Sequence, residues 1–185
     1  MPIVTVEDGT GLTNANSYQD EAAFRAYMLE IGEDVSAYTA DQVESALIMT
    51  GADYMEFQYS YCGEITFPLN PQALSFPRKE LVNRHGIEIP ESGAGSIFPD
   101  LTKAQAQLAL GQLRTGGKLN VDPNATSKGA VIENTLDVMT QKYGPAGTEA
   151  SKSEFATYQG YADKILAPYV CGGNNQFQGN NEATT

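Results

Sequence analysis

Residues 99–117 read PDLTKAQAQLALGQLRTGG, a run that begins with proline and ends with two glycines. Pro99 and Asp100 suit the first turn of a helix, where proline loses no hydrogen bond and a carboxylate meets the positive end of the helix dipole. Gly116 and Gly117 suit the end of a helix. Apolar residues lie nearly all round the helix between them: Leu101, Ala104, Ala106, Leu108, Ala109, Leu110 and Leu113. The stretch therefore predicts the most buried helix of the protein.

Three further helices are predicted from apolar residues that recur at helical spacing. The first has Ser17 as its N-cap and ends at Gly32, and the second is capped by Thr39 and ends near Phe57. The last takes Ser151 or Ser153 as its N-cap. We interpret the following stripes as core: Phe24, Tyr27, Met28 and Ile31; Val43, Leu47, Gly51, Tyr54 and Met55; Phe155, Tyr158, Ala162, Ile165, Leu166 and Tyr169.

The remaining segments lack helical periodicity. Residues 58–97 contain prolines that interrupt every candidate helix and aromatic residues that argue against disorder, so we expect a long ordered loop that makes contacts. Residues 130–143 are rich in β-branched residues and predict a strand or a hairpin that bends near Asn134. The predicted fold is mainly α: a four-helix body over residues 1–170 and an extended, low-complexity tail over residues 171–185.

The composition is acidic. Asp and Glu number 23 against 11 Lys and Arg in 185 residues, which gives a formal net charge of −12. Generic nucleic-acid binders draw their affinity from Lys and Arg, so this class is disfavoured. Cys62 and Cys171 lie far apart without a C-x-x-C motif, and we expect free thiols in a reducing compartment. Neither a membrane span nor a signal peptide is evident, so we expect synthesis in the cytoplasm and no membrane partner.

No motif indicates catalysis, a cofactor or a metal, and we expect a protein that is not an enzyme. Residues 111–118 resemble a phosphate-binding loop only loosely, because Leu119 stands where the Mg²⁺-binding hydroxyl belongs. A helix that ends at Gly-Gly is the favoured interpretation. His85 could act as a general base only beside a nucleophile, and the sequence does not show that one lies close to it. We expect a histidine in a surface loop instead.

One local cluster is both basic and aromatic. It consists of Arg78, Lys79 and Arg84 with Phe76 nearby. A strand of nucleic acid could stack on it. The interpretation that we favour is that Arg78 pairs with carboxylates of a neighbouring helix or subunit, because the molecule as a whole is acidic.

Several runs together resemble one known family. They are Val6 to Leu12, Ala15 to Tyr18, Ala22 to Phe24 with Tyr27, Ala46 to Ile48, Ala52 to Tyr54, Gln72 to Arg78, Ala104-Gln105 and Leu108-Ala109. Over about residues 4–170 the chain resembles the tailed-phage family often labelled "DnaT-like ssDNA-binding", whose members are similar to head-tail connector adaptors. The chain departs from relatives in having no tryptophan, and Phe76 stands where relatives often place one.

The resemblance implies a mostly helical adaptor in the neck of the virion. Such adaptors assemble as a ring, of about twelve copies, beneath the portal protein of the capsid. The ring extends the channel through which double-stranded DNA passes without specific binding, and it joins a downstream neck or tail protein. In similar adaptors the C-terminal segment docks on the portal. The candidate interface residues are Phe76, Arg78, Lys79, Arg84, Tyr169, Phe177 and Gln178.

Two functions follow from these observations. The first is a structural connector, whose negatively charged channel wall lets DNA slide without sticking. The alternative is a single-stranded DNA-binding replication accessory protein that uses Phe76, Arg78, Lys79 and Arg84. The alternative requires a DNA affinity that falls steeply with salt, whereas the connector predicts negligible binding at physiological ionic strength.

Overall fold

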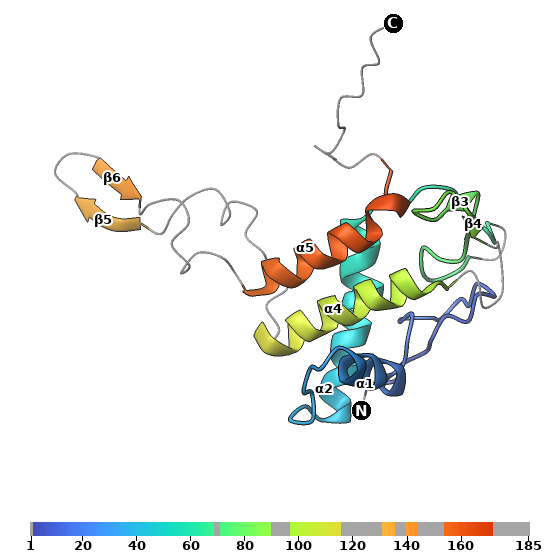
Figure 1. The fold of residues 1–185 in the computed structure, drawn as a ribbon, viewed down its shortest axis with the longest axis horizontal. Coiled ribbons are helices and arrows are strands. Elements are labelled where there is room, and N and C mark those ends of the chain that lie inside the picture. Colours follow the sequence, from blue (N-terminus) through green and yellow to red (C-terminus); the bar gives the residue numbers. More distant parts are fainter. Residues whose placement is uncertain are drawn as a thin grey trace, which may run out of the picture.

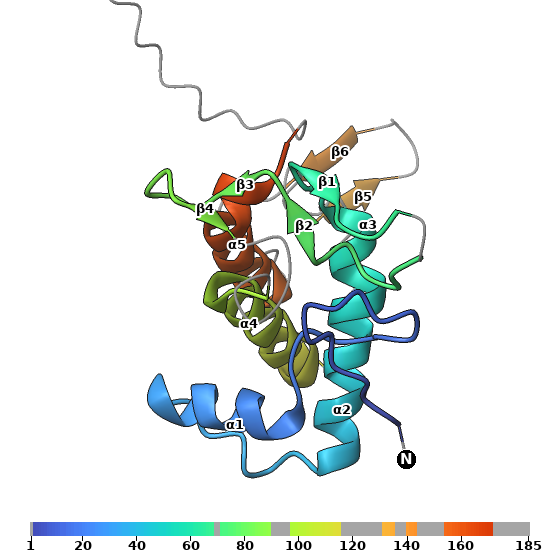
Figure 2. The same ribbon diagram turned by 90° about the vertical axis from the view of Figure 1, so that its right-hand side faces the viewer.

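The computed structural model describes residues 2–68, 71–89, 97–115, 131–135, 140–143 and 154–171, and they form a mainly helical protein, as predicted (Figure 1). Helices α4 and α5 pack side by side, and the α2 helix continues through η1 and α3 past them (Figure 2). The helical elements are α1 (Glu21–Glu30), α2 (Ala40–Ile48), η1 (Met49–Met55, a π-helix), α3 (Glu56–Gln58), α4 (Pro99–Thr115), α5 (Glu154–Leu166) and η3 (Ala167–Tyr169, a 3₁₀-helix).

The start of α1 differs from the prediction. Its N-cap is Asp20, whose side chain accepts a hydrogen bond from the N–H of Ala23, and not Ser17. Ser17 is engaged elsewhere, because its main chain bridges to Val6 and its hydroxyl donates to the carbonyl of Gln19. The helix ends at Glu30, and its C-cap Ile31 directly precedes Gly32, which has a positive φ of 79°.

The second predicted helix is present but not uniform. Thr39 caps it as predicted, and together with Gln42 it forms a reciprocal capping box. The helix widens into the π-helix η1 from Met49 to Met55 and ends at Gln58, close to the predicted end. The periodicity did not predict the π-helix. It surrounds Gly51, where a Cβ would lie 2.7 Å from the side chain of Gln105 and 3.1 Å from the carbonyl oxygen of Asn16.

Residues 58–97 form an ordered loop, within its described part, that carries two short antiparallel sheets. Strand β1 (Glu64–Ile65) pairs with β2 (Arg78–Lys79), and β3 (Leu81–Val82) pairs with β4 (Glu88–Ile89). We expected an ordered loop that makes contacts, and its aromatic residues are part of what orders it. Two of them lie in the chain's own core, in the cluster that includes residues of α4: these are Tyr61 and Phe76, with Leu74, Leu81 and Ile89 buried around them.

Helix α4 lies between two apolar clusters, as its pattern predicts. Residues Leu101, Ala104 and Leu108 belong to the cluster shared with α5 and the 58–97 loop. Residues Ala106, Ala109 and Leu110 belong to the cluster shared with α1 and α2: Phe24, Met28, Val35, Val43, Ala46 and Leu47. Opposite faces of one helix thus join the two halves of the core.

The predicted β element is an antiparallel hairpin. Strand β5 (Val131–Thr135) pairs with β6 (Thr140–Tyr143), and Asn134 lies inside β5 opposite Gln141, so the expected bend near Asn134 is wrong. The predicted caps Ser151 and Ser153 and the tail beyond Cys171 lie outside the described residues. In the described part of the chain, no helix has the length and apolar character that crossing a bilayer requires.

Candidate functional site

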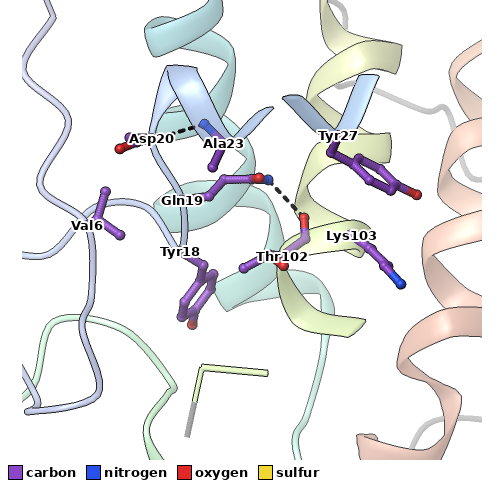
Figure 3. Close-up of a pocket in the computed structure, with 8 residues that line it drawn as sticks. All are labelled: Val6, Tyr18, Gln19, Asp20, Ala23, Tyr27, Thr102 and Lys103. Carbon is purple, nitrogen blue, oxygen red and sulfur yellow. Dashed lines mark hydrogen bonds between the residues drawn. The ribbon is translucent and has the colours of Figure 1, made fainter. Parts of the chain in front are cut away.

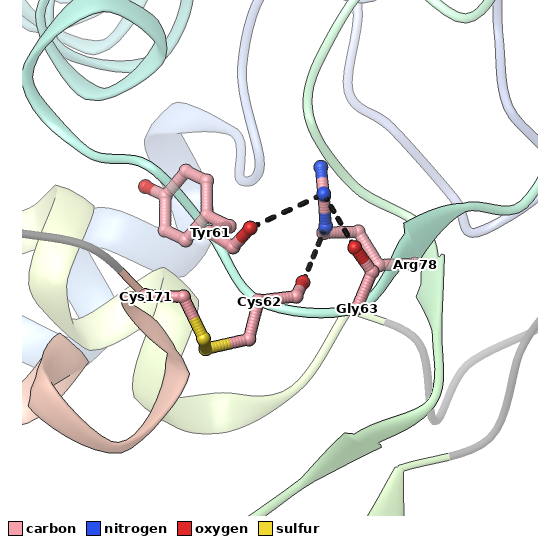
Figure 4. The surroundings of a disulfide bond; sticks show 5 residues. All are labelled: Tyr61, Cys62, Gly63, Arg78 and Cys171. Carbon is pink, nitrogen blue, oxygen red and sulfur yellow. Dashed lines mark hydrogen bonds between the residues drawn. A yellow bond between two sulfur atoms is a disulfide. The ribbon is translucent and has the colours of Figure 1, made fainter.

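The Arg78 side chain, which the sequence singled out, lies against the turn formed by residues 61–63 (Figure 4). Its Nε donates to the carbonyl of Cys62 at 2.7 Å, and its Nη2 donates to the carbonyls of Gly63 at 2.8 Å and Tyr61 at 3.2 Å. A fourth, longer bond of 3.4 Å reaches the carbonyl of Ser75. The guanidinium therefore clamps the main chain of one turn.

This geometry corrects the expected partner of Arg78. We expected carboxylates of a neighbouring helix or subunit, but the partners of the guanidinium are main-chain carbonyls of its own chain. The physical reason is that a tight turn leaves carbonyls without main-chain donors, and arginine offers five N–H groups in a fixed fork. Burial lowers the pKa of Arg78, and the nearby carboxylate of Glu56 acts in the opposite direction.

Phe76, the proposed stacking residue, is fully buried. Its ring lies 4.8 Å from that of Tyr61 and 5.5 Å from that of Phe98, centroid to centroid, in edge-to-face arrangements. The ring has no face open to a nucleotide base. The structure thus places Phe76 in the core and not on a contact surface.

The other two cations of the cluster are paired with carboxylates. Lys79 lies 3.2 Å from Glu64 across the β1–β2 sheet, and Arg84 lies 2.8 Å from Asp100 at the start of α4. Asp100 also accepts a 2.9 Å hydrogen bond from the hydroxyl of Tyr169. Both ion pairs are partly exposed, so solvent and salt weaken them.

Tyr169 was predicted as an interface residue, and it is buried. Its ring packs on Phe98 with the centroids 4.5 Å apart. Burial raises the pKa of Tyr169 to about 12, and the hydrogen bond to Asp100 acts in the same direction. Of the seven predicted interface residues, Phe76 and Tyr169 are thus core residues, while Phe177 and Gln178 lie outside the described residues.

Cys62 and Cys171 form a disulfide bond beside the Arg78 clamp (Figure 4). This corrects the expectation of free thiols. The two residues are separated by 109 positions in sequence, and only the packing of η3 against the 58–97 loop brings their Cα atoms to 4.9 Å. The main chain already joins the two segments, since Cys62 N–H donates to the Tyr169 carbonyl and Cys171 N–H donates to the Ser60 carbonyl, both at 2.8 Å.

A hollow of about 320 Å³ lies between the 18–20 turn, α1 and α4 (Figure 3). Two of its polar groups are already bonded within the chain: Gln19 Nε2 donates to the carbonyl of Thr102, and Asp20 caps α1. The Lys103 side chain points away from Asp20, and no ion pair of Lys103 occurs within the described ranges. The hollow is therefore part of the packing contact between α1 and α4, and its lining brings no two reactive side chains together.

Two buried polar residues organise the motifs that carried the family resemblance. The Glu7 carboxylate accepts hydrogen bonds from the N–H groups of Gly9, Gly11 and Leu12 at 2.8–2.9 Å. The Gln105 amide accepts from Tyr18 N–H and donates to the Ser17 hydroxyl and to the Leu47 carbonyl. Sequence reasoning missed both roles. The available signals were an acidic residue directly before a glycine-rich turn and a glutamine on the most apolar helix.

The described residues give no sign of reactive chemistry at His85. This residue lies exposed in the turn between β3 and β4, where its main-chain N–H donates to the side chain of Asn83. Among the residues that the structure describes, no group of three or more His, Cys, Asp or Glu side chains is arranged to hold a metal ion.

Comparison with known proteins gives one family. The family model described as "Putative DnaT-like ssDNA binding protein" matches residues 1–182. No curated protein and no solved structure matches the chain.

Proposed function

The chain belongs to this DnaT-like family, and we propose that within it the protein serves as a structural connector of a tailed-phage neck, without catalytic activity. In this proposal, copies of the chain form a ring beneath the portal protein, extend the DNA channel and receive a downstream neck or tail protein. The resemblance of the sequence to head-tail adaptors supports this arrangement.

One observation carries the choice between a connector and a DNA-binding protein. The cluster that would bind single-stranded DNA is engaged within the chain: Phe76 is buried, Arg78 holds carbonyls, and Lys79 and Arg84 pair with carboxylates. Binding phosphates there would break these contacts and expose a core aromatic ring. Such a site lacks the open cations and stacking faces on which single-strand affinity depends.

The charge of the chain supports the same proposal. A net charge of −12 repels a polyanion on average, and a ring of such chains keeps DNA moving through its channel. A channel lining that neutralised phosphates would retain the DNA instead.

The experiment that tests the proposal is native mass spectrometry of the purified full chain, alone and mixed with the portal protein of the same phage. We expect a ring-sized mass increment on the portal, from which the copy number follows. A salt titration of binding to single-stranded DNA runs in parallel, and we expect negligible affinity at physiological salt. Salt-sensitive DNA binding without portal association would overturn the proposal.

The family description favours a second candidate, binding of single-stranded DNA. Because the Arg78 cluster is engaged, this function would need another surface. Tyr161 and Lys164 lie three residues apart on α5, the tyrosine is 56% exposed, and Lys164 is in none of the ion pairs in the described ranges. If DNA binding is observed, Tyr161→Ala and Lys164→Ala should weaken it and Lys79→Ala should not.

A further inference from the structure

We propose that Cys62 and Cys171 form a redox-operated lock, in which oxidation of two thiols fastens the end of η3 to the 60–63 turn. The solution redox conditions would then set how firmly the chain is held directly before residue 172. This inference concerns the folded chain itself and does not depend on the proposed connector function.

The fold places the two cysteines together by contacts that do not involve sulfur. Tyr61 and Val170 form an antiparallel bridge, flanked by the two 2.8 Å main-chain hydrogen bonds of Cys62 and Cys171. The resulting Cα–Cα separation of 4.9 Å falls within the range that a disulfide spans. The reduced protein therefore holds its thiols ready to react.

Contacts with the rest of the folded chain hold both segments of this bridge in place. On one side, the Arg78 guanidinium holds the carbonyls of residues 61–63. On the other side, Tyr169 is buried against Phe98 and hydrogen-bonded to Asp100. Only the last residues of the described chain, Val170 and Cys171, depend on the bridge and the disulfide for their position.

The difference in exposure sets the order of the chemical steps. Cys171 is exposed and Cys62 is half-buried, so a small disulfide such as oxidised glutathione meets Cys171 first. The Cys171 thiolate attacks one glutathione sulfur, forms a mixed disulfide and releases one glutathione thiolate. The Cys62 thiolate then attacks the Cys171 sulfur and releases the second. Two protein thiols are oxidised, one glutathione disulfide is reduced to two thiols, and the two cysteine protons pass to them.

The bond changes the local opening of the chain. Without it, residues 170–171 are held by one isolated bridge, which has no neighbouring strand to support it. Such bridges open at low free energy while the core remains closed. With the bond, the same residues can separate from the turn only when the disulfide breaks or a larger part of the fold opens.

The test uses the full chain equilibrated in glutathione buffers from fully reduced to fully oxidised. Mass spectrometry under acid quench counts the thiols, and hydrogen exchange follows the amides of Cys62 and Cys171. We expect one intramolecular disulfide under oxidising conditions and exchange slowed by about tenfold or more at these two amides. The far-UV circular dichroism should remain the same in all buffers, because the helical body stays folded in both redox states. Thiols that stay reduced in oxidised glutathione, or oxidation that leaves the two amides unchanged, would overturn the proposal.

Three variants keep the test specific. Cys62→Ser with Cys171→Ser should fold, because the contacts that join the segments remain, and it should exchange as fast as the reduced protein in every buffer. Cys62→Ser alone should capture glutathione at Cys171 faster than Cys171→Ser captures it at Cys62, since Cys171 is more exposed. A double variant whose exchange still follows the redox buffer would contradict the proposed lock, and equal capture rates would contradict the proposed order of attack.

Discussion

At the scale of single residues, buried polar side chains form hydrogen bonds that hold separate segments of the chain together in addition to the apolar contacts. The carboxylate of Glu7 is 1% exposed and receives three main-chain N–H groups of the turn that follows it. Gln105 connects the 17–18 segment to the end of α2 in the same manner. Each residue accepts hydrogen bonds from buried main-chain N–H groups that would otherwise have no partner.

We predict that Glu7→Gln lowers the free energy of unfolding by about 2 kcal/mol, because a charged acceptor is replaced and an amide N–H₂ meets a main-chain donor. Urea denaturation of the purified chain measures the change. Asp8→Asn is the matched control, since Asp8 is exposed and bonds only to its neighbour Thr10, and it should shift the urea midpoint little. Equal shifts in the two variants would argue against the proposed role of Glu7.

Tyr169 carries a prediction at alkaline pH. Its pKa is raised to about 12 in the folded protein, mainly by burial, against about 10 when the chain is unfolded. A raised pKa stabilises the fold fully below the unfolded value and loses that effect as the pH rises through the folded value. The unfolding free energy of the wild type should therefore fall more between those two pH values than that of Tyr169→Phe, which has no phenol to ionise.

The same variant has an effect at neutral pH. Tyr169→Phe removes the hydrogen bond to Asp100 and should destabilise the protein by about 1 kcal/mol. Urea denaturation at a series of pH values measures both effects. Parallel curves for the two proteins at alkaline pH would show that the phenol does not titrate differently in the folded state.

At the scale of elements, the two faces of α4 hold the body together. Leu108 is fully buried there, and Leu108→Ala should lower the unfolding free energy by about 2–5 kcal/mol. Lys103→Ala on the exposed side of the same helix should stay within about 0.5 kcal/mol. Calorimetry or urea denaturation distinguishes them, and a loss below about 1 kcal/mol at Leu108 would mean that α4 is peripheral.

Replacing each of two helical glycines by alanine should change the stability of the protein in opposite directions. A Cβ at Gly51 would crowd the Gln105 side chain and the Asn16 carbonyl, so Gly51→Ala should destabilise the protein by about 1–3 kcal/mol. A Cβ at Gly160 in α5 would meet nothing within 4 Å in the part of the chain that the structure describes. Gly160→Ala should therefore stabilise by about 0.5–1 kcal/mol through helix propensity. Thermal unfolding compares the pair, and the same sign in both would contradict the packing argument at Gly51.

Periodicity predicted the elements well, because apolar spacing and caps are local signals. The bounds of α4, the Thr39 cap and the end of the second helix near Phe57 all followed from neighbouring residues. The π-helix and the Asp20 cap did not. Gly51 in the π-helix lies against Gln105 and Asn16, and Ser17 is bonded by Gln105, and no local pattern records contacts between segments so distant in sequence.

At the scale of the whole molecule, the disulfide closes a loop between residues 109 positions apart. Cross-linking a long loop restricts the unfolded chain, and native disulfides typically contribute about 2–5 kcal/mol. Reduction should therefore lower the melting temperature while the far-UV circular dichroism of the folded state stays the same. The Cys62→Ser and Cys171→Ser double variant should melt with the reduced protein. A melting temperature that reduction leaves unchanged would show that the bond does not constrain the unfolded state.

The candidate site was harder to predict than the fold, for one physical reason. Composition showed which residues carry charge, but only the packed chain shows what each charge contacts. Arg78 belongs to the one basic and aromatic cluster of the sequence, yet its partners are the carbonyls of residues 61–63, which no residue type indicates. Nothing local in the sequence pairs Cys62 with Cys171, because 109 positions separate them.

The packing of α5 on α4 also affects how the protein emerges from the ribosome. Helix α4 ends at Thr115 and α5 starts at Glu154, so 38 residues must be added before synthesis of α5 begins, the helix that covers the face of α4 carrying Leu101 and Leu108. At translation rates of about 5–20 residues per second this takes roughly 2–8 s. During that interval the nascent chain displays an apolar helix surface of the kind that cotranslational chaperones bind.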